Sequence, residues 1–303
     1  MASEILFFST LSSTPKTSIP DRELPVRVIT PVSGADSLRE ILVSLVRDFP
    51  AARQLAWRLF LRDTRAQYRQ SILGFVWLFL PPIANTGVWI FLNSQNIITV
   101  DTGNVSYPLF VLTGTVLWGA FSAALSGSIG VVGEAAGMIS KLNFPHEALL
   151  LSAFLKVSLN TLIQSLLLIP AFFFLSVTPD FGIAWLPVGL LFLILLGFAI
   201  GVFLIPLGTL YTDVGRGVQL ALRFAFFLTP VVYPIPDTGI GRWLATVNPV
   251  SPLLVTTRGF MLGGEPYEWL TALVVAVASI VLLCFGVLIY KLAMPRLIER
   301  MSS

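Results

Sequence analysis

Few residues of this 303-residue chain could do chemistry, and several of them share one short stretch. Residues 140–154, SKLNFPHEALLLSAF, hold Lys141, Glu147 and the only histidine, His146, between two long apolar runs. No lysine follows a glycine, which excludes the phosphate loop G-x-x-x-x-G-K-[ST]. One histidine without H-E-x-x-H leaves no zinc site, and no G-x-S-x-G elbow offers a nucleophile. The stretch therefore points to contact with a partner and not to catalysis.

The composition is that of an integral membrane protein. Apolar residues make up 55% of the chain and charged residues 12%, whereas soluble domains carry about 25% charged residues. The mean hydropathy is +0.85. Residues 1–36 are rich in Ser, Thr and Pro, and they lack the basic start of a signal peptide. We expect this part to be a disordered cytoplasmic tail.

Hydropathy predicts an all-α fold with six transmembrane helices in one domain over 71–295. The apolar runs that can cross about 30 Å of hydrocarbon lie near 72–92, 107–132, 148–176, 185–211, 218–233 and 270–291. Lysines and arginines gather before the first run and at alternate connections, so the positive-inside rule places both termini, including the tail at 296–303, in the cytoplasm.

Residues 37–70 form amphipathic helices before the first span. Ser37 and Glu40 make a capping box, and Pro50 is suited to opening a second helix. An apolar stripe then lies beside a basic stripe, which suits helices in the inner leaflet. A soluble helical hairpin is the alternative. The apolar stripe is Ala52, Leu55, Ala56, Leu59 and Phe60, and the basic stripe is Arg58, Arg62, Arg65 and Arg69.

Residues 234–269 are expected to form a re-entrant helical pair before the last span. The segments RWLATV and PLLVTTRGFML are apolar but too short to cross a membrane, and NPVSP separates them. Buried irregular backbone is tolerated only against protein or a wet cavity. We expect the pair to cap the external end of a pathway.

No acid lies in the middle of a predicted span, which argues against a proton- or sodium-coupled carrier. Asn85, Asn160 and Gln164 are more typical of hydrogen bonds between helices than of ligand binding. If the protein transports a substrate, the energy must come from another chain.

A short helix is predicted over about 134–143, between the second and third spans. The residue before a proline disfavours the helical conformation, so this helix should end near Asn143. Pro145 should then start the next span, with Glu147 at its positive N-terminal dipole. A small, mixed-polarity helix held between two spans has the form of a docking element. A solvated turn is the alternative.

Five segments, in order, carry a family resemblance over roughly residues 50–295. RDTRAQYRQSILGFVWLFLPP (62–82) fits R-D-x-x-x-x-Y-x-x-S-x-L-G-x-x-W at the entry to the first span. It is followed by YPLFVLTGTVLWGAFSAAL (107–125), ISKLNFPHEAL, LYTDVGR (210–216) and LTPVVYP with NPVSPL. Together they resemble the permease subunits of ATP-binding-cassette exporters for lipid-linked polysaccharide, of the O-antigen and teichoic-acid type. His146 departs from the pattern, which usually has a basic residue, mostly arginine, at that place.

The resemblance implies a homodimer of six-span subunits in the bacterial inner membrane, with two separate ATPase subunits beneath it. ATP and magnesium would bind to the ATPases, and this chain would bind no cofactor, metal or nucleic acid. The short helix at about 134–143 would be a coupling helix that sits in a groove of each ATPase. Membrane lipid would surround the entrance for a lipid-linked polysaccharide. The side chains assigned to ATPase docking are Glu134, Met138, Lys141, Leu142, Phe144 and His146.

Aromatic side chains of the first and fifth spans are candidates for lining the channel, because aromatic faces cover the C–H surfaces of sugars. Packing between helices is the alternative. The candidates are Phe75, Trp77, Phe79, Trp89, Phe224, Phe227 and Tyr233. Arg62, Arg65 and Arg69 could bind the diphosphate of the lipid head, since guanidinium groups match phosphate oxygens. Ordinary attraction to anionic lipid would also explain them.

Three other functions stay open. An exporter permease for a drug or another small molecule would need less aromatic lining. A membrane-embedded glycosyl- or acyltransferase would need clustered acids or histidines, which the sequence lacks. A passive channel would have no use for a docking helix.

Overall fold

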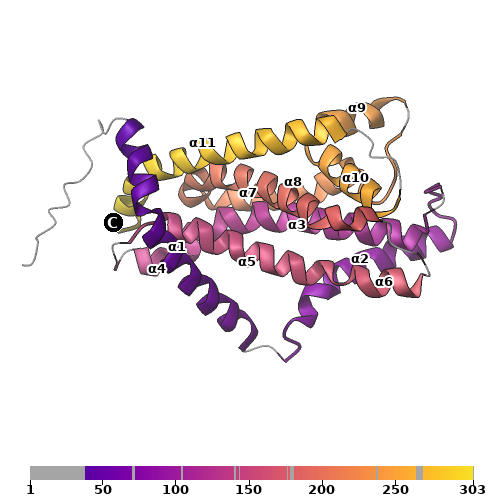
Figure 1. Ribbon diagram of the computed structural model, residues 1–303, viewed down its shortest axis with the longest axis horizontal. Coiled ribbons are helices and arrows are strands. Elements are labelled where there is room, and N and C mark those ends of the chain that lie inside the picture. Colours follow the sequence, from indigo (N-terminus) through magenta and orange to yellow (C-terminus); the bar gives the residue numbers. More distant parts are fainter. Residues whose placement is uncertain are drawn as a thin grey trace, which may run out of the picture. The chain divides into compact units, whose positions relative to one another are not determined.

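The computed structural model describes residues 38–69, 72–103, 105–139, 141–142, 144–175, 177, 181–236, 238–263 and 269–302. Within these ranges every regular element is a helix, as predicted, and there is no strand (Figure 1). The predicted tail, residues 1–36, lies outside the described part of the chain. The elements are α1 (Leu38–Arg69), α2 (Val76–Ser94), α3 (Tyr107–Glu134), α4 (Ala136–Ile139), α5 (Glu147–Ser165), α6 (Leu168–Phe174), the 3-10 helix η1 (Phe181–Trp185), α7 (Leu186–Leu210), α8 (Thr212–Leu228), α9 (Ile240–Val247), α10 (Val250–Met261) and α11 (Trp269–Ser302).

Five helical segments among the described residues are long and apolar enough to cross a membrane. They are Val76–Ser94, Tyr107–Ile139, Glu147–Phe174, Phe181–Leu210 and Trp269–Arg300, and each coincides with a predicted span. The remaining prediction, 218–233, corresponds to α8, which has 17 residues and is not among the five. This helix ends at Leu228 because Pro230 holds the preceding residue, Thr229, in an extended conformation, with φ −98° and ψ 140°.

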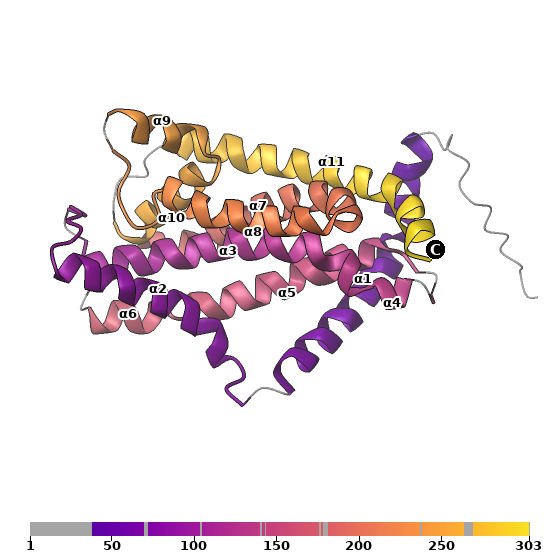
Figure 2. The ribbon, with the colours of Figure 1, turned by 180° about the vertical axis from the view of Figure 1, so that it is seen from behind.

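The core of the bundle is α3, which packs most extensively against α7. Nineteen of the 28 residues of α3 are buried, as expected of a helix that is apolar all round. Gly197 and Gly201 of α7, in the sequence GFAIG, allow the two helices to approach closely. A Cβ at Gly197 would overlap the backbone carbonyl of Phe121 in α3. This is the small-residue packing common between membrane helices. In Figures 1 and 2, α3 lies between α7 and α5.

The two helices expected over 37–70 form the single helix α1, which contains Pro50. The expected apolar stripe is present, since Ala52, Ala56, Leu59 and Phe60 are all buried. However, α1 packs against α5, so this stripe lies on protein and not on the inner leaflet. Contacts that begin at Ala52, two residues after the proline, help to hold the helix together where Pro50 removes one backbone hydrogen bond.

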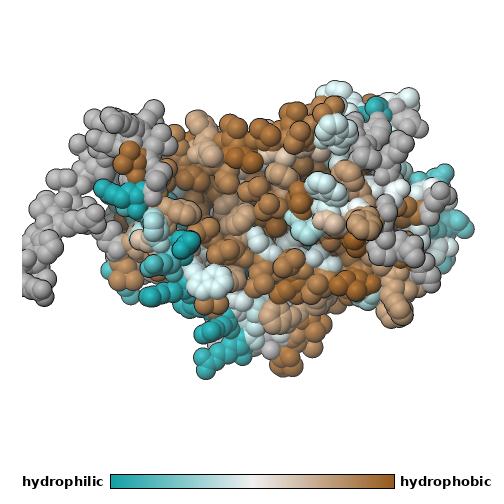
Figure 3. All heavy atoms as spheres, viewed as in Figure 1, coloured by the Kyte–Doolittle hydropathy of each residue, from teal (hydrophilic) through white to brown (hydrophobic). Residues whose placement is uncertain are grey.

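The two ends of the bundle differ. At one end, which we call the α4 end, lie α4, the start of α5 and the last turns of α11 (Figure 2). At the other, the α9 end, lie α9, α10 and the start of α11. The short helices α9 and α10 are the pair predicted over 234–269. Nine of the 12 residues of α10 are buried, whereas α9 exposes Ile240, Trp243 and Val247. Figure 3 shows apolar side chains across the middle of the visible face and hydrophilic ones near α1.

Candidate functional site

The candidate coupling segment, residues 133–146, runs from the last two residues of α3 to the start of α5. Its helix, α4, is shorter than predicted and covers only Ala136–Ile139. Glu134 belongs to the last turn of α3, because that helix continues two residues beyond the predicted span boundary at 132. Backbone bonds from Lys141 and Leu142 to the carbonyl of Met138 extend the turn beyond α4. Ser140 and Asn143 lie outside the described residues.

The predicted docking side chains divide into two groups. Glu134, Lys141 and Leu142 are exposed, Leu142 to 60%. Met138, Phe144 and His146 are half-buried and hold the segment to the rest of the protein, together with Ile139, which is 5% exposed. The Met138 sulfur lies 4.0 Å from Nη1 of Arg62, so the segment also contacts α1. Only the first group is free to meet a partner.

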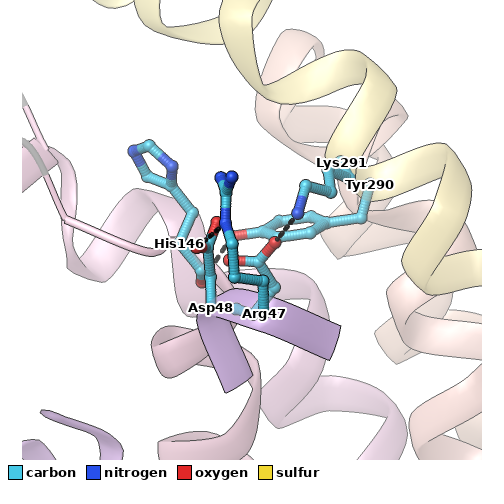
Figure 4. Close-up of polar contacts among 6 residues, drawn as sticks. Arg47, Asp48, His146, Tyr290 and Lys291 are labelled. Carbon is cyan, nitrogen blue, oxygen red and sulfur yellow. Dashed lines mark hydrogen bonds and ion pairs between the residues drawn. The ribbon is translucent and has the colours of Figure 1, made fainter. Parts of the chain in front are cut away.

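His146 lies where the coupling segment meets α5 and α11. Its ring is 5.2 Å from that of Phe144. Burial lowers the pKa of His146, the Glu147 carboxylate opposes this shift, and the Lys291 ammonium adds to it. Its backbone carbonyl accepts a 3.1 Å hydrogen bond from the Tyr290 hydroxyl, and Glu147 Oε1 pairs with Lys291 Nζ at 2.7 Å. Figure 4 shows Tyr290 of α11 reaching toward His146, and it also shows the separate pair of Arg47 and Asp48 in α1.

Tyr290 and Lys291 are functional candidates that the sequence did not reveal. The positive-inside rule accounts for Lys291 as one of many basic residues at this end. No spacing relates it to Glu147, which lies 144 positions earlier in the chain. An acid that starts one span and a base that ends another lie at the same depth when both ends are on the same side of the membrane. This is the signal from which the pair could have been found.

The structure places the predicted lipid-head arginines together on one face of α1. Arg62, Arg65 and Arg69 are exposed and, with Arg58, line one open depression of the surface. Arg62 Nε is 2.8 Å from Asp63 Oδ1, and both side chains are well exposed. Exposed pairs of this kind contribute about 1 kcal/mol or less, so Arg62 keeps most of its capacity to bind an anion.

The predicted channel aromatics lie in two groups and not in one lining. Trp89 lies beside Phe227, with ring centroids 6.3 Å apart, and the Tyr233 hydroxyl donates to the Phe227 carbonyl at 2.7 Å. Phe75 instead stacks on Tyr68 of α1 at 3.9 Å. The other candidates are Trp77 and Phe224, which are exposed, and Phe79, which is half-buried. Phe226 and Trp118, 6.0 Å apart, join the Trp89 group from α8 and α3.

Two of the polar residues within spans join helices, as predicted. Asn160 of α5 accepts a 2.9 Å hydrogen bond from the Tyr68 hydroxyl. Gln164 Nε2 donates to the backbone carbonyl of Leu78 at 2.9 Å. Within the described ranges, no three His, Cys, Asp or Glu side chains are grouped so that they could hold a metal ion.

Arg258 lies in the predicted re-entrant segment PLLVTTRGFML, and it is 4% exposed, on the inner side of α10. Its Nη1 donates to the backbone carbonyl of Val231 at 3.0 Å. Its guanidinium carbon lies 3.7 Å from the ring centroid of Phe110 in α3. Arg258 therefore ties α10 to the non-helical stretch after α8, a role that its position in the sequence did not suggest.

Comparison with known proteins places this arrangement in a family. The family model "ABC-2 type transporter" matches residues 54–263. The O-antigen export system permease protein RfbA of Myxococcus xanthus is 25% identical over 249 residues, covering 80% of this chain and 93% of that protein. RfbA of Klebsiella pneumoniae is 25% identical over 217 residues, which are 70% and 82% of the two chains. The polysialic acid transport protein KpsM of Escherichia coli is 22% identical over 241 residues, or 77% and 91%.

Permeases of this type work with ATPase subunits, and the matched region is the membrane domain. Its five candidate spans make this a multi-pass membrane protein. With a family match that spans most of its length, the chain belongs to the ABC-2 type transporter family, as the membrane permease and not as the ATPase subunit.

Proposed function

We propose that this chain is the permease subunit of an ATP-driven exporter that moves a lipid-linked polysaccharide, of O-antigen type, across the bacterial inner membrane. Similarity to three polysaccharide export permeases along most of their length supports the substrate class. The single observation that carries the mechanism is the coupling segment, which presents Glu134, Lys141 and Leu142 outward between two long spans. In the proposal an ATPase binds this exposed group, and ATP and magnesium bind to the ATPase.

The proposal includes α8 as a sixth crossing, with both termini in the cytoplasm. Gln219 of α8 hydrogen-bonds to Ser126 of α3 at 2.9 Å, and Phe226 lies beside Trp118. The stretch after α8 then reaches Gly114 at Val231. Twelve residues of α3 separate these contacts, or about 18 Å at 1.5 Å per residue. Thus α8 and its extension run beside nearly half of α3, toward the α9 end. In the proposal they return the chain to that end, which gives an even number of crossings.

A second copy of the chain would complete the conduit. Trp77 of α2 and Phe224 and Phe227 of α8 are large apolar side chains that this subunit leaves exposed. Transfer of each sugar hydroxyl into hydrocarbon costs roughly 4–8 kcal/mol, so a polysaccharide needs a lined path. A homodimer that brings these aromatic surfaces together would supply one. The basic face of α1 at the entrance would then bind the anionic lipid head.

The proposal is tested by co-purification with a candidate ABC ATPase, followed by the ATPase rate in lipid vesicles with and without lipid-linked polysaccharide. A stable complex whose rate responds to this substrate supports the exporter. A stable complex whose ATPase rate does not respond supports the permease role and excludes a lipid-linked polysaccharide as its substrate. No complex with any candidate ATPase removes the proposal.

A charge reversal in the coupling segment locates the docking site. Lys141→Glu should abolish co-purification, because Lys141 is exposed in the segment. Arg216→Glu, the same charge change on the exposed start of α8, is the matched control and should leave the complex intact. Equal binding by both variants would place the ATPase elsewhere.

A further inference from the structure

Tyr290 and Lys291 of α11 contact His146 and Glu147, the two residues at which the coupling segment meets α5. The Tyr290 hydroxyl donates to the carbonyl of His146, and the Lys291 ammonium pairs with the Glu147 carboxylate (Figure 4). We call these four residues the α11 clamp. One contact is to the backbone of His146 and the other is to a side chain in the first turn of α5. The clamp therefore fixes the junction between the coupling segment and α5.

The clamp is better protected from water than the ion pair of Arg47 and Asp48 in α1. The side chains of Lys291 and Glu147 are 22% and 20% exposed, whereas those of Arg47 and Asp48 are 65% and 38% exposed. Charges that are partly removed from water are less screened by salt and interact more strongly. Tyr290 is 1% exposed, so its hydroxyl depends on the protein for a partner. Both contacts therefore stabilise one arrangement of the junction.

The clamp connects α11 to the coupling segment, although the two are not neighbours in the sequence. Covalent bonds link the segment to α3 and to α5, whereas α11 lies at the other end of the sequence. Away from the clamp, α11 packs mainly on α7 and also on α10 at the α9 end. Since a helix is stiff along its axis, a displacement at Tyr290 and Lys291 is passed to the start of α11, next to α10.

We propose that Tyr290 and Lys291 are positioning residues, through which movement of the coupling segment reaches α11 and, by way of α11, the α10 helix at the opposite end. This rests on the proposed function, in which an ATPase moves the segment. A break in the clamp should leave the ATPase bound and the segment moving, while the far end of α11 no longer follows.

The experiment measures distances between spin labels on the two copies of the dimer, in complex with the ATPase, with and without ATP and vanadate. Cys284, which is exposed, is first replaced by alanine. Gly133→Cys reports on the segment, where a side chain meets nothing within 4 Å, and Leu273→Cys reports on the exposed start of α11. In the intact clamp both distances should shift with nucleotide.

Lys291→Glu should abolish the shift at Leu273→Cys and keep the shift at Gly133→Cys. The exchange Glu147→Lys with Lys291→Glu restores the pair in reverse and should restore the Leu273→Cys shift, which a merely destabilised variant would not show. Tyr290→Phe, a smaller change, should reduce that shift. Arg296→Glu, on the exposed side of α11, is the control and should change neither distance.

The outcomes separate the two proposals. If the distance between labels at Leu273→Cys still changes fully in both Lys291→Glu and Tyr290→Phe, the proposed role of the clamp is wrong. The proposed exporter function is then unaffected. If Gly133→Cys does not shift in the intact clamp, the segment does not carry the ATPase movement, and the proposed mechanism fails together with the clamp. If the Leu273→Cys shift is lost in Lys291→Glu and regained in the exchanged pair, the clamp is established.

Discussion

Two cations are withdrawn from water at opposite ends of the bundle, and they are satisfied in different ways. At the α4 end, Lys291 keeps 22% of its side chain exposed and meets a carboxylate at 2.7 Å. At the α9 end, Arg258 is 4% exposed and meets a backbone carbonyl at 3.0 Å and the ring of Phe110. The first partner carries a full charge on a side chain, whereas the second set offers only partial charges from backbone and ring.

The difference follows from the chemistry of the two side chains. An ammonium is compact and strongly hydrated, so it stays where water still reaches it and pairs with a full charge. A guanidinium is planar and more weakly hydrated, and it stacks on aromatic rings. The α4 end is thus held by a pair of full charges that water still reaches in part. The α9 end is held by a contact that depends on the shape of the backbone around it.

The largest effect should come from Gly114→Ala, which acts on the backbone that receives Arg258. A Cβ at Gly114 would overlap the carbonyl oxygen of Val231, the acceptor of the Arg258 hydrogen bond. Overpacking and the loss of a hydrogen bond to a charged group should together lower the free energy of unfolding by about 3 kcal/mol or more. The melting temperature in detergent measures this.

Gly87→Ala is the control for that change, because nothing lies within 4 Å of a Cβ at Gly87. Both variants make the same substitution inside a helix of a candidate span. If they melt at the same temperature, the close approach at Gly114 does not matter and the description of the α9 end is wrong.

A smaller effect should follow from Phe110→Leu, which removes the ring over Arg258 and keeps an apolar side chain. A desolvated cation–π contact contributes up to about 2 kcal/mol. Phe121→Leu, at a buried ring further along α3, loses the same volume but no cation–π contact. Its loss of unfolding free energy should therefore be smaller by up to about 2 kcal/mol. Thermal unfolding of the two variants provides the comparison. Equal losses would show that Phe110 only fills space.

At the α4 end, Lys291→Met should have a moderate effect. It leaves Glu147 without its partner in a half-buried site, and we expect a loss of about 1 kcal/mol, at the upper end of the range for exposed pairs. Arg47→Met breaks the more exposed pair with Asp48 and should have almost no effect on melting. The contrast would disappear if water reached both pairs equally, and the two variants would then melt alike.

Much of the fold could be predicted from the sequence, because burial in lipid and burial in protein both require apolar residues. The five candidate spans follow from hydropathy for this reason. The same fact explains why the contact between α1 and α5 was not predicted, since an apolar stripe does not show whether lipid or protein will cover it. In α8, the effect of Pro230 on the residue before it ended the helix before the predicted boundary at 233.

The candidate site could be predicted only where it is continuous in the sequence. The coupling segment was found because Pro145 and the mixed charges mark it locally. The α11 clamp joins positions 144 residues apart, and no local pattern contains such a contact. The burial of Arg258 also has no local sign in the sequence. The carbonyl and ring that make its burial tolerable come from two other segments.

The smallest effect, and the one that only the α4 end should show, is a dependence of stability on pH through His146. Burial holds the pKa of His146 below its unfolded value of about 6.5, so the unfolded chain binds more protons in the window below that pH. Stability should therefore be constant above pH 6.5 and should fall as the pH is lowered, until the pKa of the folded state is reached. Arg258 stays charged throughout this range and adds no such dependence. His146→Asn should flatten the melting temperature between pH 7.5 and 5.5. If the slope survives in that variant, another group titrates, and the α4 end is not the pH-sensitive one.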